Sequence, residues 1–551
     1  MHEINKAWGR VVAGLVLAGL LLFGQSLDDP FHFDDVLIVN DSNVVNPAQW
    51  AHFLNPLHLR QVTYFTFYLN HLVGGTDPFT YHVVNVALHI ANAVLLLALL
   101  SRLLDRRLAL IAAAIFLAHP LQTESVMYIY QRSTLLACFF SLLALLAWQG
   151  KRSWLALPLF VLAFESKEAS LAVPLLAALG AATLVVTAQQ RRRIIAAVVL
   201  VLVAIGGTLF LLDYRGEKTV GLGVPTMTPV SYALTQSRVI YTYLRLLVFP
   251  YPQSLEYEFA IQRPNLQAVA QVAGLLFIAG LGVALARSKK WRTEGLAVLA
   301  FLVLLAPTSS FIPSADFAFE HRLYFPMLAF AVVAASIICR FKEPAWIAVP
   351  LLASLGLGTL QRGVVWNSDA SLWEDAVRHA PGKARAWFNL GGAYINADPQ
   401  RARTAYERTI ALKPDYAEAH YNLGVIEQVQ KRFVPAVNHY KDALRYSPGY
   451  WPAWNNFGNS LMGLGQKERA RLAFERVLKL NPDHWQSRYN IAVVDFNGSR
   501  FEEAIPNLRA VLDWRPQFND ARYMLAESLS RTGHPEEAQR ERSRLAQLPG
   551  R

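Results

Sequence analysis

The sequence predicts an all-α protein in two parts, a membrane helix bundle followed by an array of helical repeats. Three observations predict it. Residues 1–361 contain many long apolar runs with few charges, whereas residues 366–551 have the composition of a polar, helical sequence. Basic residues cluster in the short loops between the apolar runs. In the last third of the chain, prolines recur at intervals of 33 or 34 residues.

The apolar runs of the first part approach the length that a bilayer requires. A spanning helix needs about 20 apolar residues, because every backbone polar group must be satisfied within the helix. We predict about eleven spans, of which the short ones are tilted or packed inside the bundle. They lie near residues 11–27, 82–101, 108–118, 134–148, 153–164, 171–188, 194–212, 267–286, 294–306, 323–339 and 344–360.

The N-terminal apolar run has two interpretations. Lys6 and Arg10 precede it, as basic residues do in a cleaved signal peptide. However, no small-x-small cleavage site follows, because the run ends in the polar segment 25–30, Gln-Ser-Leu-Asp-Asp-Pro. A retained first span is the better interpretation.

The basic loops assign the two faces of the membrane. Cytoplasmic loops carry an excess of Lys and Arg, which places residues 1–10 inside and the long segment 28–81 outside. The odd number of spans then puts the C-terminal part outside as well. The segment 213–265 is also outside, and its amphipathic stretch 238–249 is interpreted as an interfacial helix. The basic loops contain Arg102, Arg106 and Arg107; Lys151 and Arg152; Arg191–Arg193; Arg287, Lys289, Lys290 and Arg292; and Arg340 and Lys342.

This loop pattern also accounts for the net charge of +12, so nucleic-acid binding is not indicated. The lipid bilayer is the partner that the basic loops imply. Cys138 and Cys339 both lie within apolar runs, so the cysteines indicate neither a disulfide framework nor a zinc site.

The C-terminal part has the period of tetratricopeptide repeats. A 34-residue unit closed by proline is the signature of these helix pairs. Stacked pairs bury their apolar faces against their neighbours and form a self-supporting superhelix. We predict about five repeats over residues 381–547, after a linker or first helix at 362–380. The closing prolines are Pro381, Pro414, Pro448, Pro482 and Pro516, and the small residues at the helix crossings are Ala402, Ala436, Ala470, Ala504 and Ala538.

A repeat array of this kind favours binding of a peptide or protein in its concave groove. A rigid spacer or an oligomerisation surface is the alternative.

The first outer loop begins with an acidic pair, Asp34 and Asp35, flanked by aromatic residues. A carboxylate near an apolar boundary can have a raised pKa and act as a general base. An acidic pair also suits a divalent cation, in which case these two residues would be its ligands. The third interpretation is an exposed acidic turn or helix start.

Three later outer loops each place a cation beside a carboxylate at the end of the bundle. Ionisable residues at membrane depth are expensive and usually functional. Arginine forks and lysines suit phosphate oxygens, so these cations are candidates for binding a lipid-linked phosphate. The alternative is structural, with ion pairs inside the protein or side chains reaching to lipid head groups. The loops contain His119, Glu124 and Arg132; Lys167 and Glu168; and Glu320, His321 and Arg322.

The order of these motifs resembles that of a known family. The chain carries Asp34-Asp35, then His119-Pro120 with Glu124, Gln131-Arg132-Ser133, Ser166-Lys167-Glu168 and Glu320-His321-Arg322-Leu323-Tyr324, followed by the repeats. In this order it resembles the transmembrane-and-TPR O-mannosyltransferases. More broadly it resembles the GT-C glycosyltransferases, which include the protein O-mannosyltransferases. The resemblance covers nearly the whole chain.

The resemblance implies a GT-C membrane domain at residues 1–361 that uses a polyprenyl-phosphate-linked sugar on the periplasmic or lumenal face. Mannose and a protein Ser or Thr hydroxyl are the implied sugar and acceptor, and the repeats would recruit that protein. Asp34 or Asp35 would be the catalytic base, with Glu124 shaping the site. The donor phosphate would be bound by Arg132, Lys167 and Arg322, with a less constrained role for His321.

The resemblance leaves several alternatives open. The compact membrane part and short repeat array fit a bacterial relative, with the repeats in the periplasm; in a eukaryote they would be in the lumen of the endoplasmic reticulum. No cofactor is required, although a divalent cation remains compatible with the acidic pair. The competing hypotheses are a non-enzymatic scaffold for an envelope or secretion complex, and a transferase that modifies envelope glycan or lipid.

Overall fold

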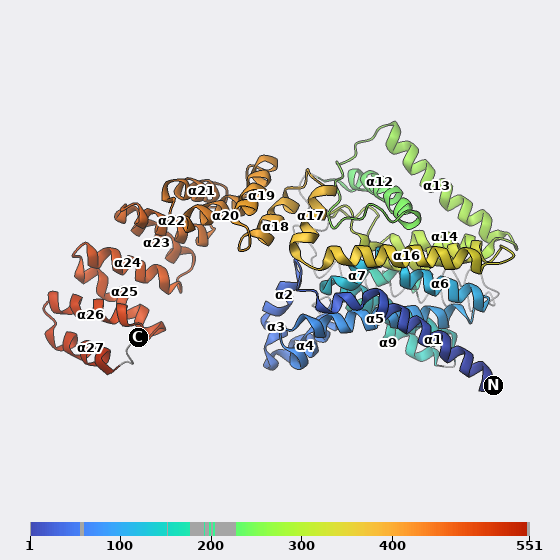
Figure 1. Cartoon of the computed structure of the whole chain (residues 1–551), viewed down its shortest axis with the longest axis horizontal. Coiled ribbons are helices and arrows are strands. Elements are labelled where there is room, and N and C mark those ends of the chain that lie inside the picture. The colour runs from blue at the N-terminus through green and yellow to red at the C-terminus, as the bar shows by residue number, and fades with distance from the viewer. Residues whose placement is uncertain are drawn as a thin grey trace. The chain divides into compact units, whose positions relative to one another are not determined.

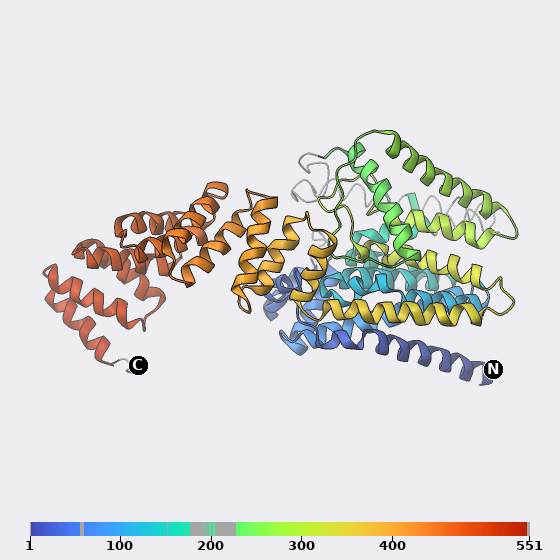
Figure 2. The same cartoon turned by 45° about the horizontal axis from the view of Figure 1, so that its top comes forward.

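The computed structural model describes residues 2–54, 60–150, 152–176 and 227–547, with isolated positions between 192 and 203. The chain divides into two compact units, residues 1–380 and 381–551. Every regular element in the described ranges is helical, which confirms the all-α prediction. Figures 1 and 2 show the first unit as a bundle of long helices and the second as a succession of helix pairs.

The long helices of the first unit pack side by side (Figure 1). Helix α5 contacts α1, α6 and α8, and α15 contacts α6 and α14. Their ends follow from local sequence: Asp77 caps the first turn of α5 and Asp105 caps α6, each by accepting backbone N–H groups. The helices are α1 (His2–Phe23), α5 (Pro78–Leu100), α6 (Arg106–Ala118), α8 (Arg132–Gln149), α9 (Ala156–Ser166), α12 (Pro229–Val248), α13 (Leu266–Arg287), α14 (Arg292–Leu305), α15 (Tyr324–Ile338) and α16 (Ala345–Trp366).

Six described helices are long and apolar enough to cross a membrane, or seven if one bent pair is a single span. The bent pair is 106–118 with 120–127, and 156–166 is a shorter apolar helix. The predicted spans 171–188 and 194–212, and the basic loop at 191–193, lie wholly or largely outside the described residues. The total of about eleven spans therefore stays a prediction, while the bundle of membrane helices is confirmed.

Helix α12 is not among the helices that meet the criteria for a span. The sequence likewise predicts an interfacial helix, and not a span, at residues 238–249. Its position along the membrane surface remains a prediction.

Short helices and turns form the end of the bundle away from the N-terminus (Figure 1). Because α1, α6, α9 and α16 end there while α8 and α15 begin there, segments distant in sequence meet. In particular, α7 contacts both α16 and the turn η8. The short elements are η1 (Gly24–Asp28), α2 (Asp35–Asn40), α3 (Ser42–Val45), η2 (Pro47–Leu54), α4 (Gln61–Gly74), η3 (Pro120–Gln122), α7 (Thr123–Met127), η4 (Ile129–Gln131), η6 (Glu168–Leu171), η8 (Glu320–Leu323) and α17 (Asp369–His379).

The second unit consists of five helix pairs, as the proline period predicts. Within each pair the helices pack closely; a Cβ added to Gly424, for example, would lie 2.6 Å from the ring of Tyr440. The pairs are α18 (Ala384–Tyr394) with α19 (Pro399–Leu412), α20 (Ala417–Val429) with α21 (Phe433–Tyr446), α22 (Trp451–Gly463) with α23 (Lys467–Leu480), α24 (Trp485–Asn497) with α25 (Phe501–Trp514), and α26 (Asn519–Arg531) with α27 (Pro535–Gln547).

Buried carboxylates connect neighbouring repeats. The fully buried Asp495 on α24 accepts from Nε of Arg471 in the preceding repeat and from Nε of Arg500 in its own, both at 2.9 Å. Two repeats earlier, Glu427 on α20 occupies the equivalent position and pairs with Arg403. These ion pairs join the second helix of one repeat to the first helix of the next.

The variant Asp495→Asn is expected to destabilise the repeat unit by about 2 kcal/mol, because it removes the buried charge that Arg471 and Arg500 share. The cost is below that of a wholly buried pair because the side chains of Arg471 and Arg500 are about a third exposed. Thermal unfolding of the full chain in detergent measures the change. The exposed Asp513→Asn on α25 is the control, and equal stability of the two variants would contradict the assignment.

Candidate functional site

The acidic motif divides into two residues with different surroundings. Asp35, the first residue of α2, is fully buried. Its Oδ1 accepts from the N–H of Tyr130 at 2.7 Å, and its Oδ2 accepts from the N–H of His32 at 3.1 Å and of Ile129 at 3.3 Å. Burial raises the pKa of Asp35 to about 7, against the opposing effect of these hydrogen bonds. Asp35 therefore ties the start of α2 to the turn that precedes α8.

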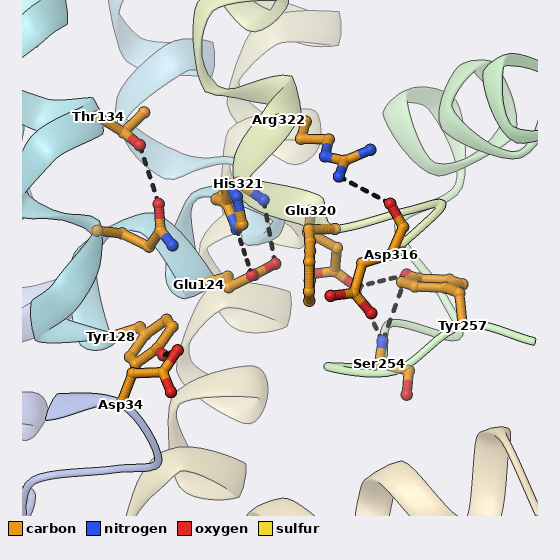
Figure 3. A network of polar contacts seen from close by, with 12 residues as sticks. Asp34, Glu124, Tyr128, Thr134, Ser254, Tyr257, Asp316, Glu320, His321 and Arg322 are labelled. Atoms are coloured by element: carbon orange, nitrogen blue, oxygen red, sulfur yellow. Dashed lines mark hydrogen bonds and ion pairs between the residues drawn. The ribbon is translucent and has the colours of Figure 1, made fainter. Parts of the chain in front are cut away.

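Asp34 is the more accessible of the two carboxyl groups. It lies directly before α2, is partly exposed, and accepts a hydrogen bond at 2.9 Å from the hydroxyl of Tyr128. Burial and the two nearby carboxyl groups raise the pKa of Tyr128 well above its usual value, so the phenol stays protonated and donates. Asp34 thus has one oxygen oriented by Tyr128 (Figure 3).

Helix α17 supports this loop from the other side. The buried His32 ring contacts Oδ1 of Asp369 at 2.8 Å through Nδ1. Phe33 has a φ of +46°, an uncommon conformation for a bulky residue, and its ring lies 5.5 Å from that of Trp373 and 6.4 Å from that of Tyr128. Aromatic packing therefore holds the backbone in a strained conformation immediately before Asp34.

Glu124 connects helix α7 to the turn η8. This buried residue of α7 accepts from the backbone N–H of His321 at 3.0 Å, and its Oε1 lies 2.6 Å from Nδ1 of the same histidine. The His321 ring also stacks on Phe319, with centroids 5.0 Å apart. Glu124 and His321 form a single pair at the centre of the site (Figure 3). Both of these predicted site residues are thus brought together.

Glu320, which the sequence analysis did not single out as a site residue, anchors the segment after α12. Its Oε1 accepts from the N–H of Ser254 at 2.8 Å and from the hydroxyl of Tyr257 at 2.5 Å, and its Oε2 accepts from Gln253 at 2.7 Å. Gln253 in turn donates to the carbonyl of Pro120 at 3.1 Å. Glu320 is therefore occupied with holding three loops together.

Lys167 is a buried cation with neutral neighbours. Its ammonium donates to Oε1 of Gln131 at 2.9 Å and to the hydroxyl of Thr134 at 2.6 Å. Burial and the positive charge of Arg60 together lower the pKa of Lys167 to about 7. The carboxylates of Glu168 and Glu124 oppose this change. In the described ranges Lys167 forms no ion pair, since Glu168 is paired with Arg60 at 2.6 Å.

Arg322 also lacks a carboxylate partner among the residues that the structure describes. Its guanidinium donates to three backbone carbonyls, those of Thr308, Phe317 and Asp316, at 3.3, 2.9 and 2.9 Å. The side chain is partly exposed and lies over the ring of Phe319, with the guanidinium carbon 5.5 Å from the centroid. Arg322 and Lys167 are therefore two cations near Glu124 and His321 whose charge is not neutralised by an ion pair.

Arg132 has different surroundings. It is fully buried, and its guanidinium donates to Oδ1 of Asn85 at 3.0 Å and to the carbonyls of Tyr81 at 3.0 Å and Thr66 at 3.3 Å. The rings of Phe67 and Tyr81 cover it. Binding a phosphate through Arg132 would require these bonds to break. It joins α5 and α8 to α4.

Sequence reasoning missed several residues that build this site. Gln131 and Thr134 hold Lys167, and Asp369 and Trp373 of α17 hold the acidic loop. Of these four residues, the sequence indicated only Gln131, through its position next to Arg132. No cluster of three or more His, Cys, Asp or Glu side chains suited to a metal ion is found in the described residues.

The variants Asp34→Asn and Asp35→Asn are expected to differ in stability. Asparagine at position 35 places an amide NH₂ against backbone N–H groups, so Asp35→Asn should cost about 2 kcal/mol and lower the unfolding temperature. Asparagine at position 34 can still accept from Tyr128, so Asp34→Asn should leave that temperature unchanged. Differential scanning fluorimetry in detergent measures both, and the reverse order would refute the division of roles.

Comparison with known proteins shows that the chain is similar to protein O-mannosyl-transferases. Tetratricopeptide repeat family models match residues 396–450, 455–513 and 499–547. Protein O-mannosyl-transferase TMTC3 of Homo sapiens is 25% identical, over 97% of this chain and 63% of its own length. Protein O-mannosyl-transferase F38B6.6 of Caenorhabditis elegans is 26% identical over 73% of this chain and 63% of its own. Protein O-mannosyl-transferase TMTC4 of Mus musculus is 27% identical, over 73% and 66%.

Among solved structures, that of YrrB, a TPR protein with an unusual peptide-binding site, is 21% identical and covers 32% of this chain and 91% of its own, with a TM-score of 0.30. The chain spans about 63% of the length of the human relative. It is thus similar over nearly its whole length to transferases named for protein O-mannosylation, and it combines membrane helices with tetratricopeptide repeats as a relative of that group.

Proposed function

We propose that this protein is an integral-membrane glycosyltransferase that transfers a sugar, mannose, from a polyprenyl-phosphate-linked donor to Ser or Thr hydroxyls of proteins. Transfer takes place at the outer end of the bundle, on the periplasmic or lumenal face. The proposal is carried by one end of the bundle that holds a partly exposed carboxylate, Asp34, and two cations, Lys167 and Arg322, that form no ion pair with the residues that the structure describes. The naming of the relatives as protein O-mannosyl-transferases supports the sugar and the acceptor.

The residues divide between the two sides of a single displacement. Asp34 takes the proton from the acceptor hydroxyl as its oxygen bonds to the anomeric carbon. The bond from that carbon to the phosphate oxygen breaks, and the polyprenyl phosphate leaves with the electron pair. Lys167 and Arg322 stabilise the charge on the phosphate, which requires fixed positive groups in a site poor in water. Attack opposite the leaving group inverts the anomeric centre.

The exposure of Asp34 favours it as the base, because the other acidic residues of the site are buried. Asp35 is buried with three backbone N–H donors, and Glu320 with three donors of its own. Glu124 is paired with His321 and acts by positioning that loop and the adjacent Arg322. Since the phosphate is already a good leaving group, a divalent cation is compatible with this chemistry but not required for it.

Asp34→Asn is expected to reduce sugar transfer by about 10²–10⁴-fold, the usual contribution of a general base. Transfer from a defined polyprenyl-phosphate mannose to a Ser/Thr-containing acceptor protein, followed by glycan mass spectrometry, measures it. Asp41→Asn is the matched control, because it removes a charge from the same loop while asparagine preserves its capping of α3. Wild-type transfer by Asp34→Asn would refute Asp34 as the base, whereas absence of transfer by the wild-type protein would favour a non-enzymatic scaffold.

Donor binding should weaken as the pH rises through about 7, because the pKa of Lys167 lies there and only the ammonium attracts the phosphate. The phosphodiester of the donor keeps one negative charge across this range, so the change belongs to the protein. The Michaelis constant for the donor, measured between pH 6 and pH 9, reports this change. A lysine with its ordinary pKa of about 10.4 would stay charged over that range and would give no such change. Lys167→Arg stays charged and should abolish the pH dependence; an unchanged profile in this variant would exclude Lys167 as its source.

A further inference from the structure

The third repeat has an open groove between its two helices, α22 and α23 (Figure 1). The groove has a volume of about 360 Å³. The function proposed above uses none of its side chains. This third-repeat groove is lined by Trp454 and Phe457 of α22 and by Arg469, Leu472, Ala473 and Arg476 of α23.

The third-repeat groove is separate from the surface along which the first helices of successive repeats meet. On that surface Asn456 donates to the hydroxyl of Tyr421 on α20, and Asn459 accepts from Asn490 on α24, both at 3.1 Å. In a helix with about 3.6 residues per turn, Trp454 lies on the opposite side of α22 from both asparagines. The groove is therefore a surface of its own, built within one repeat.

The apolar side chains of the groove are held in place by their neighbours. The indole Nε1 of Trp454 donates to the carbonyl of Pro448 at 3.0 Å. Its ring packs edge to face against Phe457, with centroids 6.0 Å apart. Leu472 is 64% exposed, an unusual degree for a leucine beside two aromatic rings. The groove is therefore preformed, and a ligand that covers Leu472 gains free energy by removing apolar surface from water.

Two cations border this apolar surface. Arg469 and Arg476 are exposed residues of α23, and Leu472 lies between them. Seven residues of helix separate the two arginines by about 10 Å along the axis. Arg469 donates to the side chain of Gln466, and neither arginine forms an ion pair within the part of the chain that the structure describes. The groove therefore has a positive border that suits carboxylates of a partner.

The third repeat alone combines the two arginines with an apolar residue between them. The first repeat has arginines at both positions, Arg401 and Arg408, but the polar Thr404 replaces Leu472. The second, fourth and fifth repeats each have a carboxylate in place of one arginine and a larger residue in place of Ala473. These residues are Asp442, Glu503 and Glu537 at the arginine positions, and His439, Asn507 and Glu541 at the alanine position.

We propose that the third-repeat groove binds an acidic amphipathic helix of a partner protein. An apolar side chain of that helix covers Leu472, and two of its carboxylates pair with Arg469 and Arg476. Arginine forks bind carboxylates through paired hydrogen bonds, so the two cations also fix the register of the partner. The docking follows the general mode in which the apolar face of a helix lies in a hydrophobic groove.

A helix matches the groove in spacing as well as in charge. Residues i and i+7 of a helix are about 10 Å apart along the axis, as are the two arginines, and residue i+3 lies between them on the same face. The small side chain of Ala473 lets a second helix approach α23 closely. A lipid head group carries its charge at one point, so two separated arginines favour a protein partner.

The proposal does not rest on the proposed transferase function. Binding is measured without any sugar donor, and the variant Asp34→Asn should bind the partner helix with wild-type affinity.

Fluorescence anisotropy tests the proposal with the full-length protein in nanodiscs of a zwitterionic lipid. The probe is a labelled helical peptide with glutamates at positions i and i+7 and phenylalanine at i+3. A second peptide has lysines in place of the glutamates and is otherwise identical. The glutamate peptide should bind at least tenfold more tightly, because the lysines meet like charges at the border of the groove.

Variants of exposed residues separate the charge and the apolar contact. The double variant Arg469→Glu with Arg476→Glu should reverse the preference and bind the lysine peptide more tightly. Its control is Lys467→Glu, which changes an exposed charge on the other side of α23 and should leave the preference unchanged.

Leu472→Ser should weaken binding of the glutamate peptide about tenfold, through the lost apolar contact. Its control is Val434→Ser, a similarly exposed apolar residue of α21, which should leave the affinity unchanged.

The reversal of preference cannot arise from misfolding, since a misfolded variant would bind neither peptide. Equal affinity of the wild-type protein for the two peptides, absence of binding of both, or an unchanged preference in the double variant would each overturn the proposal. Co-sedimentation with phosphatidylglycerol vesicles that depends on both arginines, without peptide binding, would overturn it in favour of anionic lipid. A dimer of the full-length protein that Leu472→Ser dissociates would overturn it in favour of a second copy of this chain.

Discussion

The buried carboxylate of Asp35 is the constraint on which the end of the bundle away from the N-terminus depends. Its two oxygens accept three backbone N–H groups from two segments nearly a hundred residues apart. This fixes the first outer loop against the turn before α8, and so fixes Asp34 beside Tyr128. An unpaired carboxylate in that position would cost several kcal/mol, whereas a fully hydrogen-bonded one defines a single loop conformation.

The other charged side chains at this end of the bundle also have specific hydrogen-bond partners. Glu124 and Glu320 are each bonded to a neighbouring loop, so their role is to assemble the site. Lys167 and Arg322 donate only to neutral groups, so their charge remains available to an anion. Two cations free of ion pairs in the described residues suit the phosphate of the proposed donor.

The fold was largely predictable from sequence because its signals are local and periodic. Pro448 and Pro482, one repeat apart, predict helix pairs that the structure contains, and apolar length predicts helices such as α5 and α13. The site was only partly predictable. Adjacent residues Asp34 and Asp35 look alike in sequence, yet burial separates them. The sequence motif around Arg132 predicts a site residue. Its partner Asn85 comes from another helix, and no local sequence pattern predicts that contact.

A structure of the full-length protein with a bound polyprenyl-phosphate sugar, determined by electron cryomicroscopy, tests the central claim most directly. The account predicts the donor phosphate within hydrogen-bond distance of Lys167 Nζ and the Arg322 guanidinium, with the anomeric carbon facing Asp34. A phosphate bound elsewhere, with Lys167 still bonded only to Gln131 and Thr134, would contradict it.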